Sequence, residues 1–117
     1  MPHVLVVDDD PSYLIILERL CAGCGATVVT VQTADAARAA LDAEEFDLLL
    51  LDLQLDGQEG LPLIAEVEQN AKLASKTVIV TGFALLAPFF TTLPIVDKGS
   101  LTELAEYLRR ILCEPQA

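Results

Sequence analysis

Five short apolar runs divide the chain, and polar or small residues bound each of them. Runs of this length, separated by stretches with helical periodicity, are typical of buried parallel strands. The third run is predicted to be central in a sheet, whereas the fifth follows Pro94, which favours an edge position. The predicted strands are His3–Val7, Thr27–Val31, Phe46–Leu51, Thr77–Val80 and Ile95–Asp97.

Between the apolar runs, the sequence carries start and stop signals for helices. Asp10 followed by Pro11 combines an N-cap acceptor with a proline at the first helical position, and this helix should end near Gly23–Gly25. Ser100 and Glu103 form a capping box ahead of a single apolar stripe that continues to Leu112. The other helices are predicted from Ala34 to about Ala43, after a Thr33 cap, and from about Leu61 to Asn70.

This alternation predicts an α/β fold with a flavodoxin-like, doubly wound, five-stranded parallel sheet. Right-handed crossovers give the strand order 2-1-3-4-5, with helices on both faces. The segment Gly82–Phe90 is an exception, because it is almost wholly apolar and Pro88 interrupts it. Little chain separates the fourth and fifth strands, so we expect a shortened fourth helix there.

Length and charge narrow the functional class. The 117 residues are enough for one domain, residues 1–117, and too few for two. The net charge of −11 and the scattered basic residues exclude a nucleic-acid surface and favour protein partners. No apolar run approaches the ~18 residues of a membrane span, and the start does not resemble a signal peptide. We therefore expect a cytoplasmic protein without membrane contact.

The three cysteines, an odd number, argue against a disulfide framework. Cys21 and Cys24 form a Cys-x-x-Cys motif, but it falls at a helix end, where the dipole has the wrong sign to activate a thiol. A zinc site would need further ligands, and only Cys113 and His3 remain. Structural, buried thiols are the favoured interpretation.

Five polar side chains follow the apolar runs at the point where each strand should end. Asp8 and Asp9 follow the first strand, Asp52 the third, Thr81 the fourth and Lys98 the fifth. In an open parallel sheet, the carboxyl ends of the strands border one crevice, where ligands bind. Taken singly, each residue could be a turn or surface residue. Their joint occurrence in this order predicts a functional site.

The chemistry of these residues indicates a divalent cation and a phosphoryl group. Three crowded carboxylates raise one another's pKa unless a cation compensates them, and hard oxygen ligands favour Mg²⁺. Asp52, at the end of the central strand, is the candidate nucleophile, because a carboxylate can form an acyl phosphate. Lys98 and the Thr81 hydroxyl can contact the remaining phosphoryl oxygens.

The chain resembles, over its whole length, the receiver domain of two-component response regulators. Val4–Pro11 is similar to the family's first strand and acidic pair, and Leu49–Asp52 to its phosphoacceptor strand. Val78–Thr81 resembles the strand with the hydroxyl position, and Val96–Lys98 the strand with the lysine.

The resemblance implies that Asp9 and Asp52 bind Mg²⁺ together with the main-chain carbonyl of Gln54, and that Asp8 assists mostly through a water. It also implies that Asp52 is phosphorylated by a histidine kinase or a phosphotransfer protein. Such a domain is not an enzyme beyond its own phosphorylation and dephosphorylation.

For the switch, the resemblance implies that Thr81 swings toward the phosphoryl group, that Lys98 pairs with it, and that a downstream protein target recognises the altered surface. The family usually has a proline four positions after the phosphoacceptor and another after the lysine, where this chain has Asp56 and Gly99. The usual aromatic switch position is Ile95. These departures, and the motif Thr81–Phe83, resemble the single-domain FAT GUY subgroup, which implies that Phe83 is the switching aromatic.

We therefore expect a stand-alone receiver, because only residues 114–117 follow Cys113. One alternative is a degenerate receiver that binds partners without phosphorylation. The intact acidic pair, Asp52, Thr81 and Lys98 argue against it, but the departures at Asp56 and Gly99 keep it open. A second is a Mg²⁺-dependent phosphatase with an aspartyl nucleophile, although such enzymes commonly have an acid where this chain has Gln54. The oligomeric state stays open, with a homodimer as one option.

Overall fold

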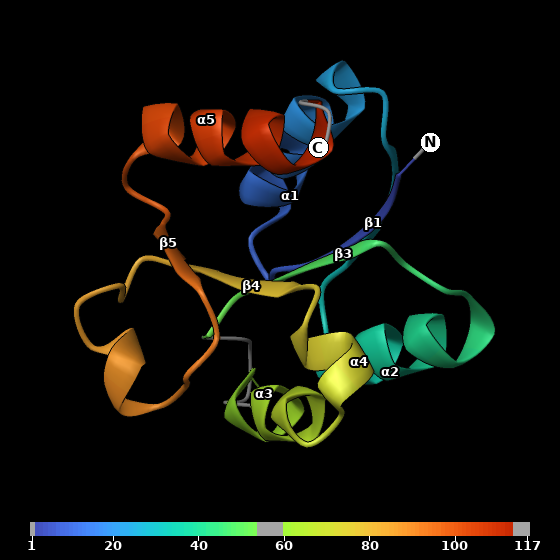
Figure 1. Ribbon diagram of the computed structural model, residues 1–117, viewed down its shortest axis with the longest axis vertical. Coiled ribbons are helices and arrows are strands. Elements are labelled where there is room, and N and C mark those ends of the chain that lie inside the picture. The colour runs from blue at the N-terminus through green and yellow to red at the C-terminus, as the bar shows by residue number, and fades with distance from the viewer. Residues whose placement is uncertain (1, 54–59, 114–117) are drawn as a thin grey trace.

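The protein is a three-layer α/β domain in which one parallel sheet separates two layers of helices (Figure 1). The computed structural model describes residues 2–53 and 60–113. The sheet order is β2-β1-β3-β4-β5, and all four strand pairs are parallel, which confirms the predicted fold class and topology. The strands are β1 His3–Val7, β2 Thr27–Val31, β3 Leu48–Leu51, β4 Thr77–Thr81 and β5 Ile95–Asp97.

The strand residues alternate between two hydrophobic cores, one on each face of the sheet. Leu5, Leu49 and Ile79 belong to the core beneath α2 and α3. Val6 and Leu50 belong to the opposite core, beneath α1 and α5. Because both faces are covered, the central strands are apolar without interruption, as the third run predicted. This run starts as a strand at Leu48 instead of Phe46.

The helices that cover the sheet begin at the residues that the sequence indicated. The side chains of Asp10, Thr33 and Ser100 accept hydrogen bonds from backbone N–H groups in the first turns of α1, α2 and α5. None of the helices in residues 2–53 and 60–113 is long and apolar enough to cross a membrane. The bounds are α1 Pro11–Gly23, α2 Ala34–Ala43, α3 Gly60–Glu68, α4 Ala71–Ala74 and α5 Leu101–Leu112.

The third helix was predicted to continue to Asn70, but it ends at Glu68. The reason is local: the Asn70 side chain accepts hydrogen bonds from the backbone N–H groups of Lys72 and Leu73 and so begins the short helix α4. Between β4 and β5 the chain forms only the 3₁₀ turn η2, Ala87–Phe89. The expected shortening of the helix between β4 and β5 is therefore confirmed, and only a 3₁₀ turn is found in its place.

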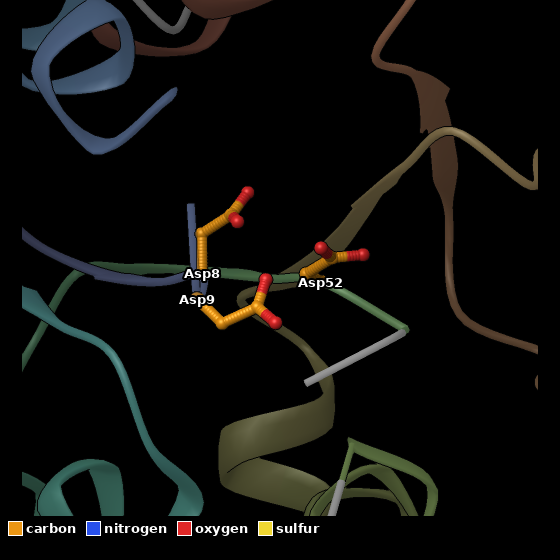
Figure 2. A group of neighbouring side chains, drawn as sticks. All are labelled: Asp8, Asp9 and Asp52. Carbon is orange, nitrogen blue, oxygen red and sulfur yellow. The ribbon is translucent and has the colours of Figure 1, made fainter. Parts of the chain in front are cut away.

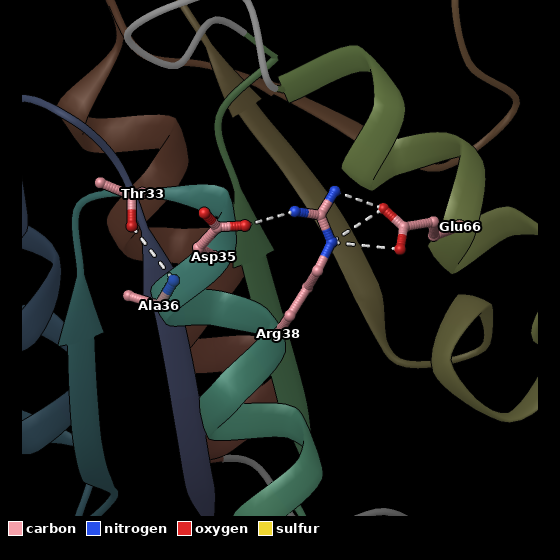
Figure 3. Close-up of polar contacts among 5 residues, drawn as sticks. All are labelled: Thr33, Asp35, Ala36, Arg38 and Glu66. Atoms are coloured by element: carbon pink, nitrogen blue, oxygen red, sulfur yellow. Dashed lines mark hydrogen bonds and ion pairs between the residues drawn. The ribbon is translucent and has the colours of Figure 1, made fainter.

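A polar contact joins α2 to α3 on one side of the sheet. Arg38 of α2 donates from Nη2 to Glu66 Oε2 over 2.6 Å and from Nη1 to Asp35 Oδ1 over 2.9 Å (Figure 3). The hydrogen bonds to Glu66 are the main cause that raises the pKa of Arg38, and they lower the pKa of Glu66. This exposed contact links the two helices that cover one face.

On the other face, α1 and α5 are joined by a disulfide bond between Cys24 and Cys113. The two residues cap the C-terminal ends of these helices, and their Cα atoms lie 5.1 Å apart across a sequence separation of 89. The expectation that the cysteines form no disulfide was therefore wrong for this pair. Cys21 is buried, as expected, and burial raises its thiol pKa to about 11.

Candidate functional site

Three carboxylates lie together at the carboxyl ends of β1 and β3, which are paired in the sheet (Figure 2). The two strands end in register, with Val7 opposite Leu51, so the residues that follow them, Asp8 and Asp52, become neighbours. Each of Asp8, Asp9 and Asp52 offers one oxygen, and these oxygens all lie within 4.8 Å of one another. The structure thus brings together three of the residues that the sequence predicted for the site.

The three carboxylates differ in their exposure to water. Asp8 is 1% exposed and Asp52 is 5% exposed, whereas Asp9 lies in solvent. Burial is the main cause that raises the pKa of Asp8, against the lowering effects of a Lys98 hydrogen bond and of the Asp10 backbone N–H. Asp8 Oδ1 accepts that N–H over 2.9 Å, which fixes the carboxylate in one orientation.

Lys98 provides the positive charge at the site. Its Nζ lies 2.6 Å from Asp8 Oδ2 and 2.9 Å from Asp52 Oδ2. Burial acts to lower the pKa of Lys98, but the hydrogen bonds to the two carboxylates prevail and raise it. One ammonium therefore bridges two buried carboxylates that follow different strands. The sequence predicted that Lys98 lies at this edge of the sheet, but it did not predict the bridge.

The donor set also fits a divalent cation. Asp8 Oδ2 is a buried oxygen, and the Lys98 ammonium 2.6 Å away compensates its charge. Three carboxylates against one ammonium leave the cluster negative. Carboxylate oxygens are the ligands that Mg²⁺ prefers, and one or two of them are usually enough.

Thr81 ends β4 beside this cluster, and its side chain is fully buried. Its hydroxyl accepts a hydrogen bond from the Phe83 backbone N–H over 3.1 Å, and its carbonyl accepts one from the Lys98 N–H over 2.9 Å. The described hydroxyl contact is therefore to the loop after β4 and not to the carboxylates. The predicted ligand Gln54, and with it Asp56, lies outside the described residues.

Tyr13 is a further residue at the site, and the sequence reasoning missed it. Its hydroxyl donates to the Lys98 carbonyl over 2.8 Å, and its ring centroid lies 4.6 Å from Lys98 Nζ. Burial is the main cause that raises the pKa of this phenol. An aromatic residue in the first helical turn after the acidic run was the signal that could have indicated it.

The family model for the response regulator receiver domain matches residues 4–89. The chain belongs to the response regulator receiver family. The match includes β1 with its acidic pair, β3 with Asp52 and β4 with Thr81. The resemblance seen in the sequence motifs is thus confirmed at the level of the family.

Two curated relatives illustrate the proteins in which such receivers occur. The chain is 41% identical over 67 residues to the DNA-binding transcriptional regulator NtrC of Salmonella typhimurium, which covers 57% of this chain and 14% of that protein. It is 41% identical over 59 residues to the sensor histidine kinase GacS of Pseudomonas protegens, covering 50% of this chain and 6% of that protein. The receiver thus spans a small part of these relatives.

A solved structure agrees in fold over nearly the whole chain. The response regulator TrrA of Thermotoga maritima, in complex with Mg²⁺ and BeF, superposes with a TM-score of 0.77 at 23% identity, covering 96% of this chain and 100% of that one. At this identity the likeness establishes the receiver fold alone.

Proposed function

We propose that this receiver accepts a phosphoryl group on Asp52 in a Mg²⁺-dependent reaction and thereby switches a protein-binding surface. The observation that carries the proposal is the bridge from Lys98 to the buried carboxylates of Asp8 and Asp52 at adjacent strand ends. Phosphoryl transfer to an aspartate requires a nucleophilic carboxylate with a positive charge and acidic metal-binding residues close to it.

Asp8, Asp9 and Asp52 are the residues that would hold Mg²⁺, with the carbonyl of Gln54 as a further proposed ligand. When bound, the ion neutralises charge on the phosphoryl oxygens and helps to align them. The solved complex of TrrA with Mg²⁺ and BeF supports this assignment by analogy.

In the proposed reaction, an oxygen of Asp52 forms a bond to phosphorus. The bond between phosphorus and the leaving group of the donor breaks, and the leaving group keeps the electron pair. Asp52 becomes an acyl phosphate. Lys98, which already contacts Asp52 Oδ2, would then pair with the phosphoryl oxygens, and the Thr81 hydroxyl would turn from the Phe83 N–H toward them.

The donor would be a phosphohistidine, on a histidine kinase or on a phosphotransfer protein. The match to a sensor histidine kinase supports this class of partner, although the matching segment is a small part of that protein. The donor's phosphoramidate bond, between histidine nitrogen and phosphorus, is a high-energy bond. Transfer of the phosphoryl group to a carboxylate therefore depends on alignment more than on covalent assistance.

The output surface would lie in the segment between β4 and β5. Leu85 is 93% exposed and Phe89 is 81% exposed, while Ala87 between them is buried. Exposed apolar groups of this kind often mark interfaces. Phe83, whose N–H contacts the Thr81 hydroxyl, is the proposed switching aromatic, as the subgroup resemblance suggested.

The test is incubation with acetyl phosphate and Mg²⁺, followed by intact-mass measurement. We expect a phosphate-sized mass gain in the wild type and none in Asp52→Asn. Asp47→Asn is the matched control, because Asp47 precedes the same strand at its opposite end and contacts the His3 N–H. No gain in the wild type would favour the degenerate binding module, and sustained turnover of a small phosphomonoester would favour a phosphatase.

A further inference from the structure

Tyr13 is placed by the same acidic run that supplies the site. Asp10 caps α1, with its side chain accepting the Ser12 N–H over 2.9 Å and its carbonyl accepting the Tyr13 N–H over 3.1 Å. Tyr13 therefore occupies the first turn of α1, directly after the carboxylates. Its phenol ring packs at the edge of the core beneath α1 and α5, which limits its rotamers.

From this position Tyr13 contacts Lys98 at two points. The hydroxyl donates to the Lys98 carbonyl over 2.8 Å, so it holds the backbone. The ring centroid lies 4.6 Å from Nζ, within the ~6 Å range of a cation–π contact, so it also holds the ammonium. Tyr13, near the start of the chain, thus contacts both the backbone and the side-chain ammonium of Lys98, which follows β5.

Lys98 is restrained only in part by the chain next to it. It follows the three-residue strand β5 and precedes Gly99, which lacks the Cβ that restricts a backbone. The Lys98 N–H is held by the Thr81 carbonyl over 2.9 Å, and the Gly99 N–H by Asp97 Oδ1 over 2.8 Å. The Lys98 carbonyl lies between these two N–H groups, and in the described part of the chain it accepts a hydrogen bond from the Tyr13 hydroxyl.

We propose that Tyr13 is a positioning residue for phosphoryl transfer, which holds the Lys98 ammonium where it meets both the buried carboxylates and the incoming phosphoryl group. This inference rests on the proposed function and deepens it. The polar contacts of the Tyr13 side chain are to Lys98, which in turn contacts Asp8 and Asp52. Tyr13 therefore sets the position of the ammonium and leaves unchanged the set of oxygens that can bind Mg²⁺. A misplaced charge is costly in this chemistry, because alignment and neutralisation supply most of the acceleration.

The experiment separates the two contacts of Tyr13. Tyr13→Phe removes the hydroxyl and keeps the ring, and Tyr13→Leu removes both. We expect the maximal rate of phosphorylation by acetyl phosphate at saturating Mg²⁺ to fall about 3- to 10-fold in Tyr13→Phe and about 10- to 100-fold in Tyr13→Leu. The Mg²⁺ dissociation constant, measured by titration without donor, should change less than about 2-fold because the ligands are untouched.

Two controls distinguish positioning from a general structural role. Tyr107→Phe removes the hydroxyl of a tyrosine that lines the groove beside β5, and it should leave the rate unchanged. In a Lys98→Met background, Tyr13→Phe should have no further effect on the rate, because the residue through which it acts is gone.

The inference is overturned if Tyr13→Phe reacts at the wild-type rate, if it lowers the rate equally with and without Lys98, or if its main effect is on Mg²⁺ affinity. A wild type that takes no phosphoryl group would overturn the proposed function itself and the role in transfer with it. Normal phosphorylation of both wild type and Tyr13 variants would overturn this inference alone.

Discussion

Replacing Lys98 with methionine should destabilise the metal-free protein. The ammonium lies 2.6 Å and 2.9 Å from two carboxylate oxygens, which corresponds to about 6 kcal/mol of gross attraction for each pair at an effective dielectric constant of ~20. The cost of burying Lys98 offsets much of this. Removing one partner of a buried pair typically costs about 3–5 kcal/mol, and we expect about 3 kcal/mol because the Lys98 side chain is still 18% exposed.

The effect should depend on pH, with a sign that follows from Asp8. Burial raises the pKa of Asp8 above its unfolded value of 3.8, so its contribution to stability is full below that value and is lost as the pH rises through the folded pKa. Lys98 opposes this shift. Without Lys98 the folded pKa of Asp8 rises further, and the variant should lose more stability than the wild type between acid and neutral pH.

The assay is thermal unfolding followed by circular dichroism, with EDTA present, at pH 4 and pH 8. At pH 8 the midpoint of Lys98→Met should lie roughly 10 °C below that of the wild type, and at pH 4 the gap should shrink. Lys72→Met, which removes a lysine from an exposed ion pair with Glu45, is the control and should change little. A Lys98→Met midpoint at pH 8 equal to or above that of the wild type would show that Lys98 does not stabilise the buried carboxylates.

Two further predictions concern the frame around the site. A Cβ at Gly60 would overlap the carbonyl oxygen of Leu53, shortly after β3, so Gly60→Ala should cost about 1–3 kcal/mol in urea unfolding. Gly23→Ala is the control and should not destabilise, because the space around Gly23 is open. Equal effects of the two substitutions would argue against the close contact at Gly60. Cys113→Ser should lower the free energy of unfolding by about 2–4 kcal/mol, because the bond to Cys24 links residues 89 positions apart in the sequence. Dithiothreitol should produce the same loss in the wild type and none in the variant. A wild-type unfolding midpoint that does not change with reductant would contradict the cross-link.

The sequence was sufficient to predict the sheet order and most helix starts, because these depend on local signals. The Thr33 cap and the Ser100 cap are examples in which one side chain satisfies a backbone N–H of the first turn. Contacts between distant segments carry no such local signal. The pairing of Cys24 with Cys113 depends on two helices ending side by side on one face, which an odd number of cysteines gives no reason to expect.

At the site, residue types at strand ends predicted the cluster of Asp8, Asp9, Asp52 and Lys98, because a parallel sheet places all carboxyl ends at one edge. The sequence could not predict how these groups pair. The bridge from Lys98 to both Asp8 and Asp52, and the contact with Tyr13, depend on side-chain conformations and on residues that lie far apart in the chain.

The most direct test of the central claim is to locate the phosphoryl group. The protein is phosphorylated with acetyl phosphate, reduced with borohydride, which cleaves an acyl phosphate, and mapped by peptide mass spectrometry, with and without EDTA. We expect a reduced side chain at position 52, formed only when Mg²⁺ is present. Modification of another aspartate in place of Asp52, or equal modification in EDTA, would contradict this claim.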